Sequence, residues 1–408
     1  MKLKPIINSP IETDAYKLNM QAVVLEKFNQ DRCRWAFRCR NNNVFFTPEM
    51  VQEISEQIDH FCSLSFSDDE REWLSKNFSW LGQSYIDFLR YWHPWRNQIT
   101  INKPTHAKYN DCGLTIEACG SWLDTMMYEI PILAIVNEVY FAFKYGVGAL
   151  DESFVKRAEE KIDKLNCGHY RLSNFSEFGL RRRYSSKTQD WVVGQFACRN
   201  IGSESHFVGT SNVYLAKKYG IKAVGTQAHE FFMAQQGHHE INPAYSNRFA
   251  LAAWNDYYKT KLGIALTDTI GTDVFLRDFD ENFAALFSGV RHDSGDPIVW
   301  GEKMIMHYKK LGIDPMTKTL LFSDSLDFDR ATKIKDHFVG KSRVAFGIGT
   351  YITNDTGVEP LNIVMKMVEC NGTPVAKLSN TPSKGMCLDN DYVNYLSKSI
   401  DWRMRYGL

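Results

Sequence analysis

The sequence lacks paired cysteines and lacks net charge. Its nine cysteines are odd in number and nowhere form a C-x-x-C pair, which excludes a disulfide scaffold and a paired-cysteine zinc site and predicts a reduced, cytoplasmic chain. The 48 basic residues are balanced by 48 acidic ones, so no overall field attracts nucleic acid or an anionic membrane surface. We therefore expect neither nucleic acid nor a membrane as a partner.

Long apolar runs are also missing. The N-terminal residues 1–17 contain no apolar core of a signal peptide, and no run reaches the roughly 18 apolar residues of a membrane span. Low-complexity segments are absent as well. The 408 residues are 44% hydrophobic and 24% charged, which is typical of a globular chain with material for two or three domains.

The N-terminal third of the chain predicts a mixture of elements. Residues 33–42 alternate enough to predict a strand, and the apolar residues of 48–64 recur at helical spacing. Residues 68–77 begin with acidic side chains, which the first turn of a helix prefers. This region therefore predicts no simple repeat.

A repeating pattern begins after about residue 170. A short apolar run is followed by small or polar residues and then by a helical or irregular stretch. Parallel strands that are buried on both faces have such apolar runs, and the repetition favours an irregular α/β barrel whose reactive rim is formed by the loops after the strands. The repeated units are residues 206–212, 221–227, 263–269, 286–297, 318–325 and 343–350.

Polar residues and glycines follow nearly every one of these strands. Loops are polar in any protein, but an α/β barrel carries its active site on these loops. The pattern therefore predicts an enzyme site at the barrel mouth. In chain order, the candidate residues are Arg181, Thr210, Ser211, Thr226 to His229, Asp268, Arg291 to Asp296, Asp324 and Gly347 to Thr350.

His229 stands between a predicted strand and a predicted helix in "VGTQAHEFF", residues 224–232. A single histidine near a core is more often a hydrogen-bonded structural residue than a catalytic one. At a helix start, however, the helix dipole lowers the pKa of the ring and keeps it neutral. A neutral imidazole can act as a base or nucleophile, with Asp268 or Asp324 fixing its tautomer. From these residues alone both interpretations stay open.

The stretch "GVRHDSGDP", residues 289–297, also has two interpretations. Asp296 followed by Pro297 is typical of a helix start, with the aspartate as N-cap and the proline in the first turn. Asp293 suits the hydroxyls of a sugar or a hydrated Mg²⁺. Both interpretations can hold together.

Two more motifs suit anions. Gly347 and Gly349 follow an apolar strand, and closely spaced glycines let backbone amides approach a phosphate, with Thr350 adding a hydroxyl. Of the three consecutive arginines at 181–183, two are expected to lie on a solvated face. One of them, beside an aromatic residue, is expected to hold a phosphate or carboxylate.

Ten short motifs occur in an order that resembles the nicotinate phosphoribosyltransferases, particularly their bacterial form. The resemblance covers the chain from about residue 8 to 390. The motifs are "TDAYKLNM" (13–20), "FRCRNN" (37–42), "EFGLRRR" (177–183), "FVGTSNVYLA" (207–216), "GTQAHE" (225–230), "LTDTIGTD" (266–273), "RHDSGDP" (291–297), "FSDSLD" (322–327), "FGIGT" (346–350) and "VAKLS" (375–379).

The resemblance implies a fold and a reaction. It implies an irregular α/β barrel over residues 141–364 and a second α/β domain built from residues 1–140 and about 365–408. The implied reaction joins nicotinate to phosphoribosyl pyrophosphate, giving nicotinate mononucleotide and pyrophosphate for NAD salvage. It also implies coupling to ATP hydrolysis, a requirement for Mg²⁺, a homodimer with shared active sites, and phosphorylation of His229.

The resemblance also assigns roles to individual residues. It implies that Phe178 stacks on one face of the pyridine ring and Tyr16 of a neighbouring subunit on the other, and that Asp268 orients His229. It places Arg181 and Arg291 near the substrate carboxylate and the phosphates. It assigns the ribose hydroxyls to Asp293 and Asp324. The 5′-phosphate is assigned to Gly347, Gly349 and Thr350, and further phosphate contacts across the dimer to Arg40 and Lys377.

Ser211 bears on substrate choice. Related enzymes that use nicotinamide resemble this chain but have an acid at this position, where an aspartate would accept from an amide and repel a carboxylate. A serine can donate to a carboxylate, which favours nicotinate. Three alternatives remain: a nicotinamide-using relative, a phosphate-binding barrel such as an aldolase, with Lys366 as its candidate lysine, and a non-catalytic metabolite-binding protein.

Overall fold

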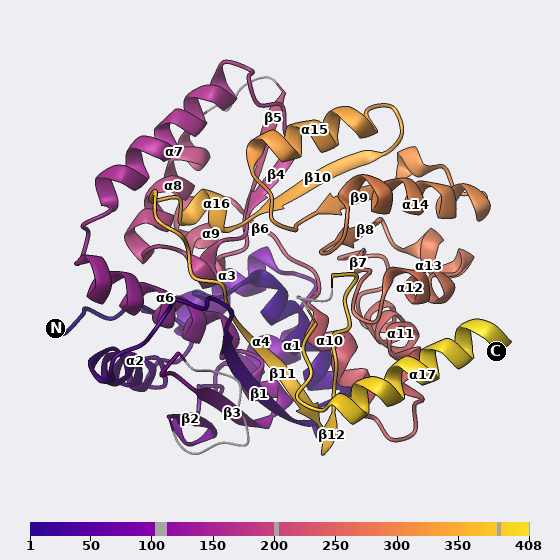
Figure 1. Cartoon of the computed structure of the whole chain (residues 1–408), viewed down its shortest axis with the longest axis horizontal. Coiled ribbons are helices and arrows are strands. Elements are labelled where there is room, and N and C mark those ends of the chain that lie inside the picture. Colours follow the sequence, from indigo (N-terminus) through magenta and orange to yellow (C-terminus); the bar gives the residue numbers. More distant parts are fainter. Residues whose placement is uncertain (103–111, 200–203, 382–384, 408) are drawn as a thin grey trace.

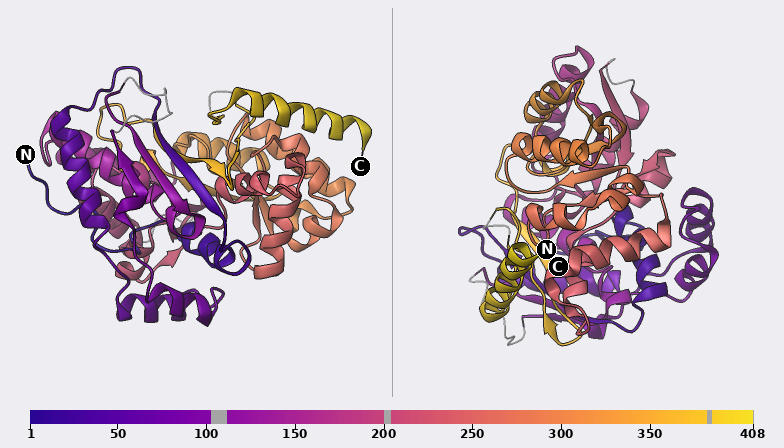
Figure 2. Two further views of the ribbon diagram at one scale, coloured as in Figure 1. Left: turned by 90° about the horizontal axis from the view of Figure 1, so that it is seen from below. Right: turned by 90° about the vertical axis from the view of Figure 1, so that its right-hand side faces the viewer.

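The computed structural model describes residues 1–102, 112–199, 204–381 and 385–407. Two β-sheets organise the chain (Figure 1). One is an antiparallel sheet of five strands, and the other is a parallel sheet of seven strands. The two chain ends lie on opposite sides of the molecule (Figures 1 and 2).

The antiparallel sheet joins distant parts of the sequence. Strand β1 lies between β3 and β11, and its residue Ala36 is paired with Glu117 on one side and Lys366 on the other. The predicted strand at 33–42 corresponds to β1. In spatial order the strands are β12 (Thr373–Pro374), β11 (Ile363–Cys370), β1 (Arg32–Cys39), β3 (Ile116–Ser121) and β2 (Ile99–Ile101).

The parallel sheet curls into an incomplete barrel. Its two edge strands are not paired with each other, but the hydroxyl of Thr226, just beyond one edge strand, donates to the carbonyl of Ile264 on the other at 3.1 Å. This sheet and the separate antiparallel one confirm the expected irregular α/β barrel with a second sheet from both ends of the chain. The spatial order is β6 (Lys222–Ala223), β5 (Ser205–Thr210), β4 (Ser173–Glu177), β10 (Arg343–Ile348), β9 (Thr319–Phe322), β8 (Gly289–His292) and β7 (Ile264–Leu266).

The helices begin and end where local chemistry predicts. Asp296 caps α14 by accepting from the amides of Ile298 and Val299, so the predicted helix start at Asp-Pro is confirmed. The helices are α1 (Ala15–Lys27), α2 (Pro48–Phe61), α3 (Asp68–Asn77), α4 (Gln83–Leu89), α5 (Trp122–Thr125), α6 (Glu129–Tyr145), α7 (Asp151–Asn166), α8 (Ser186–Cys198), α9 (Val213–Tyr219), α10 (His229–Ala234), α11 (Ser246–Tyr258), α12 (Thr272–Asp278), α13 (Glu281–Leu286), α14 (Pro297–Lys310), α15 (Phe328–Phe338), α16 (Thr350–Thr353) and α17 (Asn390–Tyr406).

Residues 122–145, which include α5 and α6, form one segment long and apolar enough to cross a membrane by length and composition. The sequence analysis expected no such segment. In the structure, 89% of its most apolar window is buried inside the protein, which is typical of the central helix of a packed core. Mostly buried apolar side chains make the segment a packing element here.

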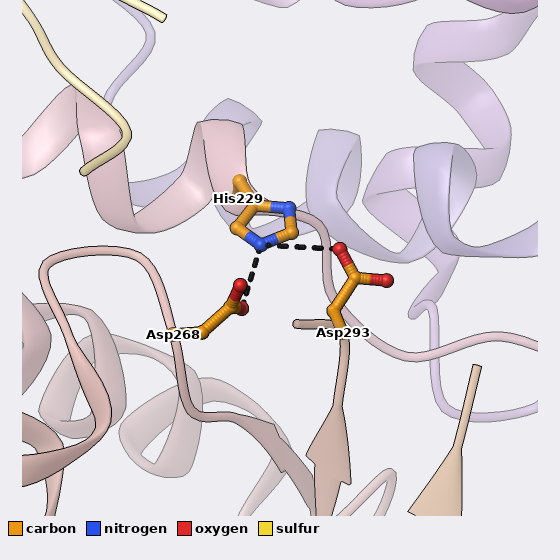
Figure 3. Close-up of side chains that lie close together, drawn as sticks. All are labelled: His229, Asp268 and Asp293. Carbon is orange, nitrogen blue, oxygen red and sulfur yellow. Dashed lines mark hydrogen bonds and ion pairs between the residues drawn. The ribbon is translucent and has the colours of Figure 1, made fainter. Parts of the chain in front are cut away.

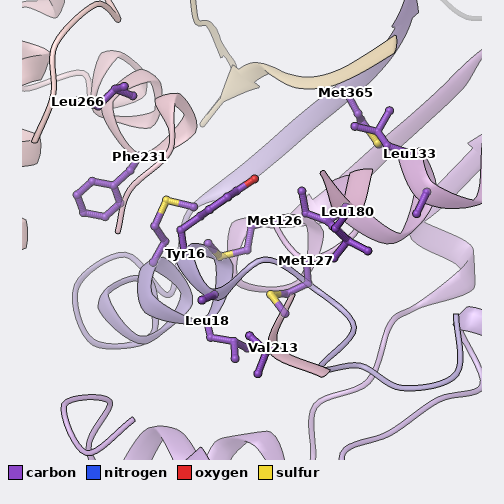
Figure 4. Packing of buried hydrophobic residues seen from close by; sticks show 14 of the residues in the cluster. Tyr16, Leu18, Met126, Met127, Leu133, Leu180, Val213, Phe231, Leu266 and Met365 are labelled. Atoms are coloured by element: carbon purple, nitrogen blue, oxygen red, sulfur yellow. The ribbon is translucent and has the colours of Figure 1, made fainter. Parts of the chain in front are cut away.

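The N-terminal segment connects the two sheets. Asp14 forms an antiparallel bridge with Asn212 just after β5, so helix α1 starts at the rim of the barrel. Tyr16, Met126 and Leu266 belong to one continuous apolar core that draws residues from both sheets (Figure 4). The rim of the barrel and the antiparallel sheet are therefore held in a fixed relation.

Candidate active site

A cavity of about 1730 Å³ opens between the rim of the parallel sheet and the antiparallel sheet. Of the residues to which the resemblance gives roles, all but two line it, and they come from both sheets. The lining includes Tyr16, Arg40, Phe178, Arg181, His229, Arg291, Asp293, Asp324, Gly347, Gly349, Thr350 and Lys377. The two exceptions are Asp268, which lies directly behind His229, and Ser211.

His229 is the first residue of helix α10 and faces two carboxylates (Figure 3). Its Nε2 lies 2.8 Å from Oδ1 of Asp268 and 3.5 Å from Oδ2 of Asp293. Asp268 follows β7 and Asp293 follows β8, so parallel strands bring both carboxylates to the same rim. Among the described residues, none donates a hydrogen bond to Nδ1, the nitrogen on the other side of the ring.

The protonation states of this group follow from burial and charge. Burial and the nearby Lys377 together lower the pKa of His229 to about 4, although Asp268 and Asp293 oppose them, so the ring is neutral at pH 7. The pKa of Asp268 is held well below its usual range by His229 and Lys377 despite burial. An ionised carboxylate can only accept, so Nε2 carries the proton and Nδ1 carries the lone pair. The neutral ring expected from the sequence is present, but burial is its largest cause.

Lys377 lies between the same two carboxylates. Its Nζ is 3.3 Å from Oδ2 of Asp268 and 3.3 Å from Oδ2 of Asp293. The ligand atoms of His229, Asp268 and Asp293 lie within 4.8 Å of one another, as a metal site requires. The ammonium already supplies the positive charge there, and Mg²⁺ prefers oxygen ligands alone, so this group does not fit Mg²⁺.

Two hydroxyl groups and one arginine complete the support of the acids. Ser294 donates to Oδ2 of Asp268 at 2.6 Å, and Ser323 donates to Oδ1 of Asp293 at 3.2 Å. Arg291 donates from Nε to the Ser323 hydroxyl at 3.1 Å and from Nη1 to the backbone carbonyl of Gln227 at 2.9 Å. These contacts hold Arg291 and both acids in place at the rim.

Tyr16 and Phe178 provide aromatic surface in the cavity, with Arg181 beside them. Tyr16 lines the cavity of its own chain, and the stacking of a neighbouring subunit's tyrosine stays a prediction. A side chain at Gly349 would approach the Phe178 carbonyl to 2.9 Å, and one at Gly347 would touch the Phe178 ring at 3.3 Å. Glycine at both positions therefore keeps room beside this ring.

Cations gather on the opposite wall. Burial and the neighbouring Arg38 lower the pKa of Arg40. Its buried Nε has no hydrogen-bond partner among the described residues. Lys366, on β11, also lines the cavity, and burial lowers its pKa to about 8. Its amine lies 3.1 Å from Oε1 of Glu129, so it is ion-paired, which argues against the free amine that an aldolase needs.

Ser211 is completely buried and does not line the cavity. Its hydroxyl donates to Oδ1 of Asp14 at 2.6 Å. Burial raises the pKa of Asp14, and Arg181 and Ser211 oppose the rise. The hydroxyl that was expected to contact the substrate therefore contacts the segment that carries Tyr16.

The expectation of a solvated face at the arginine run was wrong. Arg183 is 1% exposed, and its guanidinium lies 2.6 Å from Glu12 and 3.1 Å from the Ile6 carbonyl. Arg181 and Arg182 both line the cavity. Acceptors contributed by the N-terminal segment, more than 170 residues earlier, account for the burial of Arg183.

Sequence reasoning missed the pairing of a set of buried charges at and beneath the cavity wall, although it had named Lys366 as a candidate lysine. Their partners come from other elements, so no local pattern marked them. Two of them stand in motifs already quoted: Lys17 follows Tyr16 in "TDAYKLNM", and Glu230 follows His229 in "GTQAHE". The set comprises Lys17, Glu129, Glu230 and Lys366.

Comparisons with known proteins agree with this fold. The model of the nicotinate phosphoribosyltransferase (NAPRTase) family matches residues 173–402, and the model of the NAPRTase N-terminal domain matches residues 11–137. Nicotinate phosphoribosyltransferase of Cupriavidus necator is 42% identical over 393 residues, which are 96% of this chain and 97% of that protein. The enzyme of Salmonella typhi is 41% identical over 97% of this chain and 96% of its own.

Solved structures show the same similarity. The crystal structure of nicotinate phosphoribosyltransferase from Vibrio cholerae superposes with a TM-score of 0.88 at 34% identity, covering 97% of this chain and 94% of that one. A putative nicotinate phosphoribosyltransferase from Saccharomyces cerevisiae gives 0.86 at 33% identity, with 98% and 100% covered. Both family models and these full-length relatives show that the chain belongs to the nicotinate phosphoribosyltransferase family.

Proposed function

We propose that the chain transfers phosphoribosyl from phosphoribosyl pyrophosphate to nicotinate, giving nicotinate mononucleotide and pyrophosphate for NAD salvage, and couples this to ATP hydrolysis. Family membership supports the transfer. A cavity with an aromatic wall, several cations and an acid-rich rim suits a pyridine carboxylate and a phosphorylated sugar.

The transfer step needs positioning more than a protein nucleophile. The pyridine nitrogen attacks C1 of the ribose, the bond from C1 to the pyrophosphate oxygen breaks, and pyrophosphate leaves with the electron pair. Phe178 and Tyr16 orient the ring, and Arg181 attracts its carboxylate. Asp293 and Asp324 accept from ribose hydroxyls, and the amides around Gly347 to Thr350 receive the 5′-phosphate. Mg²⁺ brought in with the substrate would supply positive charge to offset that of the leaving pyrophosphate.

One observation carries the ATP half of the proposal: the neutral His229, which lines the cavity, donates Nε2–H to Asp268, so Nδ1 carries the lone pair. A lone pair on a fixed, uncharged ring is a nucleophile. Nδ1 attacks the γ-phosphorus of ATP, the bond to the β–γ bridging oxygen breaks, and ADP leaves. Lys377 and Arg291 lie beside the group and stabilise the phosphoryl charge. Water later cleaves the phosphohistidine and releases phosphate.

A cytoplasmic homodimer completes the proposal. No disulfide joins the cysteines of the described residues, which suits a reducing compartment. The exposed Trp402 and Tyr406 on α17 and Val299 on α14 leave apolar surface for a second copy. Sedimentation velocity measures the assembly state directly.

The coupling can be tested by counting products. Nicotinate mononucleotide and ADP are quantified together in reactions with and without ATP. We expect ATP to be consumed with product in the wild type. His229→Asn should lose ATP hydrolysis and keep a slow, ATP-independent transfer, because Nδ1 takes no part in the attack on ribose. Equal ATP hydrolysis in the variant would contradict the role of His229, and absence of transfer to nicotinate would contradict the reaction itself.

A further inference from the structure

A line of buried charges, formed by Glu129, Lys17 and Glu230, runs inward from the cavity wall, which Glu129 lines, and neither proposed step uses it. The ammonium of Lys17 is completely buried between two carboxylates. Its Nζ lies 2.8 Å from Oε2 of Glu129 and 2.5 Å from Oε2 of Glu230. One positive charge is therefore shared by two acids, which are 2% and 4% exposed.

The two ends of this line reach different parts of the site. Glu230 directly follows His229 in the first turn of α10. At the other end, Oε1 of Glu129 lies 3.1 Å from the amine of Lys366 and 3.7 Å from Nη1 of Arg181. Both of these cations line the cavity. A short run of contacts thus joins the His229 helix to the wall that would receive the substrate anion.

The two carboxylates differ in their charge. Lys17, Lys366 and Arg181 hold the pKa of Glu129 well below its usual range, although burial opposes them. Burial raises the pKa of Glu230 to about 7, against the attraction of Lys17 and with a further rise from Glu129. Oε1 of Glu230 is buried without a hydrogen-bond partner among the described residues. Glu129 is therefore ionised, and Glu230 is the acid whose charge a nearby anion would change.

We propose that Glu230, Lys17 and Glu129 are positioning residues that carry the charge state of His229 to the cavity wall and so set its affinity for the nicotinate carboxylate. The proposal rests on phosphorylation of His229. A phosphoryl group adds about 1.5 to 2 negative charges to the residue that directly precedes Glu230 in α10. We expect Glu230 to take up a proton in response, because like charges in a buried site disfavour ionisation.

Neutralisation of Glu230 would redistribute the single charge of Lys17. With Glu230 neutral, Lys17 interacts with Glu129 alone. Glu129 then attracts Arg181 and Lys366 less strongly, and both cations are freer to bind a carboxylate. ATP would thereby tighten nicotinate binding without a new contact to the substrate. The coupling is a difference in interaction energy between two charge states of the same groups.

Glu230→Gln tests this route because glutamine mimics the neutral acid and keeps an oxygen for Lys17. Nicotinate KM is measured with and without ATP in the wild type and in the variant. We expect ATP to lower the wild-type KM about fivefold or more, which is the lower end of usual coupling between sites. The variant should have a lower KM than the wild type without ATP, and ATP should change it less than about twofold. A variant with the full wild-type ATP effect would overturn the proposal.

Glu138→Gln is the matched control. Glu138 is a glutamate on α6 whose side chain is 15% exposed and whose pKa burial also raises to about 7, but it contacts Ser186 and Arg183 and not Lys17. We expect this variant to keep the wild-type ATP effect. Loss of the effect in both variants would show a general response to a lost buried charge and would also overturn the route.

Glu129→Gln removes the charge at the other end of this line, and it is the test variant if Glu230→Gln does not fold. It should likewise reduce the ATP effect on KM, whereas an unchanged effect would contradict the proposal. Phosphoenzyme formed from γ-labelled ATP is measured in the same preparations. A labelled wild type with an ATP effect that survives both substitutions refutes this route alone. An unlabelled wild type refutes the phosphohistidine and the route together.

Discussion

Two buried charge clusters in this molecule look similar in composition and differ in what faces them. The first joins His229, Asp268, Asp293 and Lys377 at the barrel rim, and the second surrounds Arg183 beneath it. Arg183 is 1% exposed and does not line the cavity, whereas His229 lines the cavity and carries a lone pair on Nδ1. Buried charge alone therefore does not identify an active site. A histidine that lines a cavity and whose reactive nitrogen keeps its lone pair does.

Arg183→Met should have the largest effect on stability. The substitution leaves the buried carboxylate of Glu12 without its 2.6 Å partner. Breaking a buried ion pair from one side costs about 3–5 kcal/mol of the free energy of unfolding. Denaturant unfolding measures this loss, and phosphoenzyme formation per folded molecule should stay unchanged. A loss below about 1 kcal/mol, the usual worth of an exposed pair, would show that this cluster is not structural.

Asp268→Asn should instead affect chemistry. Asparagine at this position no longer fixes the proton on Nε2, so Nδ1 carries a lone pair in only part of the molecules. Loss of a residue that orients a reactive histidine typically costs 10- to 100-fold in activity, and we expect a decrease of about that size in the rate of phosphoenzyme formation. Rapid-quench labelling measures the rate. A rate within twofold of the wild type would indicate that Asp268 does not orient the ring.

Ser211→Asp tests substrate choice at a smaller scale. Ser211 now donates to Asp14, and an aspartate would place a second carboxylate there, near the wall that would bind nicotinate. We expect kcat/KM for nicotinate to fall about tenfold, which corresponds to about 1.4 kcal/mol of lost transition-state binding. Ser211→Asn is the uncharged control and should lose less. An unchanged kcat/KM for nicotinate in Ser211→Asp would refute the specificity role.

The pH dependence should be the mildest effect. Burial lowers the pKa of His229 to about 4, below the ordinary 6.5, so protonation removes the lone pair only as pH falls through about 4. Phosphoenzyme formation should therefore stay nearly constant from pH 7.5 to pH 5.5. A histidine with an ordinary pKa would be about tenfold less active at pH 5.5. A tenfold decrease in the rate of phosphoenzyme formation at pH 5.5 would show that His229 has the pKa of a solvent-exposed histidine.

Much of the barrel could be predicted because its strands and caps are local features. The strand before His229, the helix start at Asp296 and the rim positions of Asp268 and Asp293 all follow from short patterns along the chain. Strand β4 was not among the predicted units, because "SNFSE" carries few apolar residues. The place of β11 beside β1 depends on pairing between residues more than 300 positions apart.

The buried charge partners could not be predicted for the same reason. Lys17, Glu129 and Glu230 come from three helices, and only tertiary packing brings them together. Nothing in the sequence distinguishes Arg183 from the two arginines before it, and its burial depends on acceptors such as Glu12. The sequence shows which charged residues are present, and the tertiary packing determines which of them line the cavity.

The most direct test of the account is the search for phosphate on His229. The wild type and His229→Asn are incubated with γ-labelled ATP and Mg²⁺, and the protein-bound label is followed in acid and in base. The account predicts an acid-labile, base-stable label on the wild type and none on the variant. A label that persists in His229→Asn, or an unlabelled wild type under conditions of full ATP hydrolysis, would contradict it.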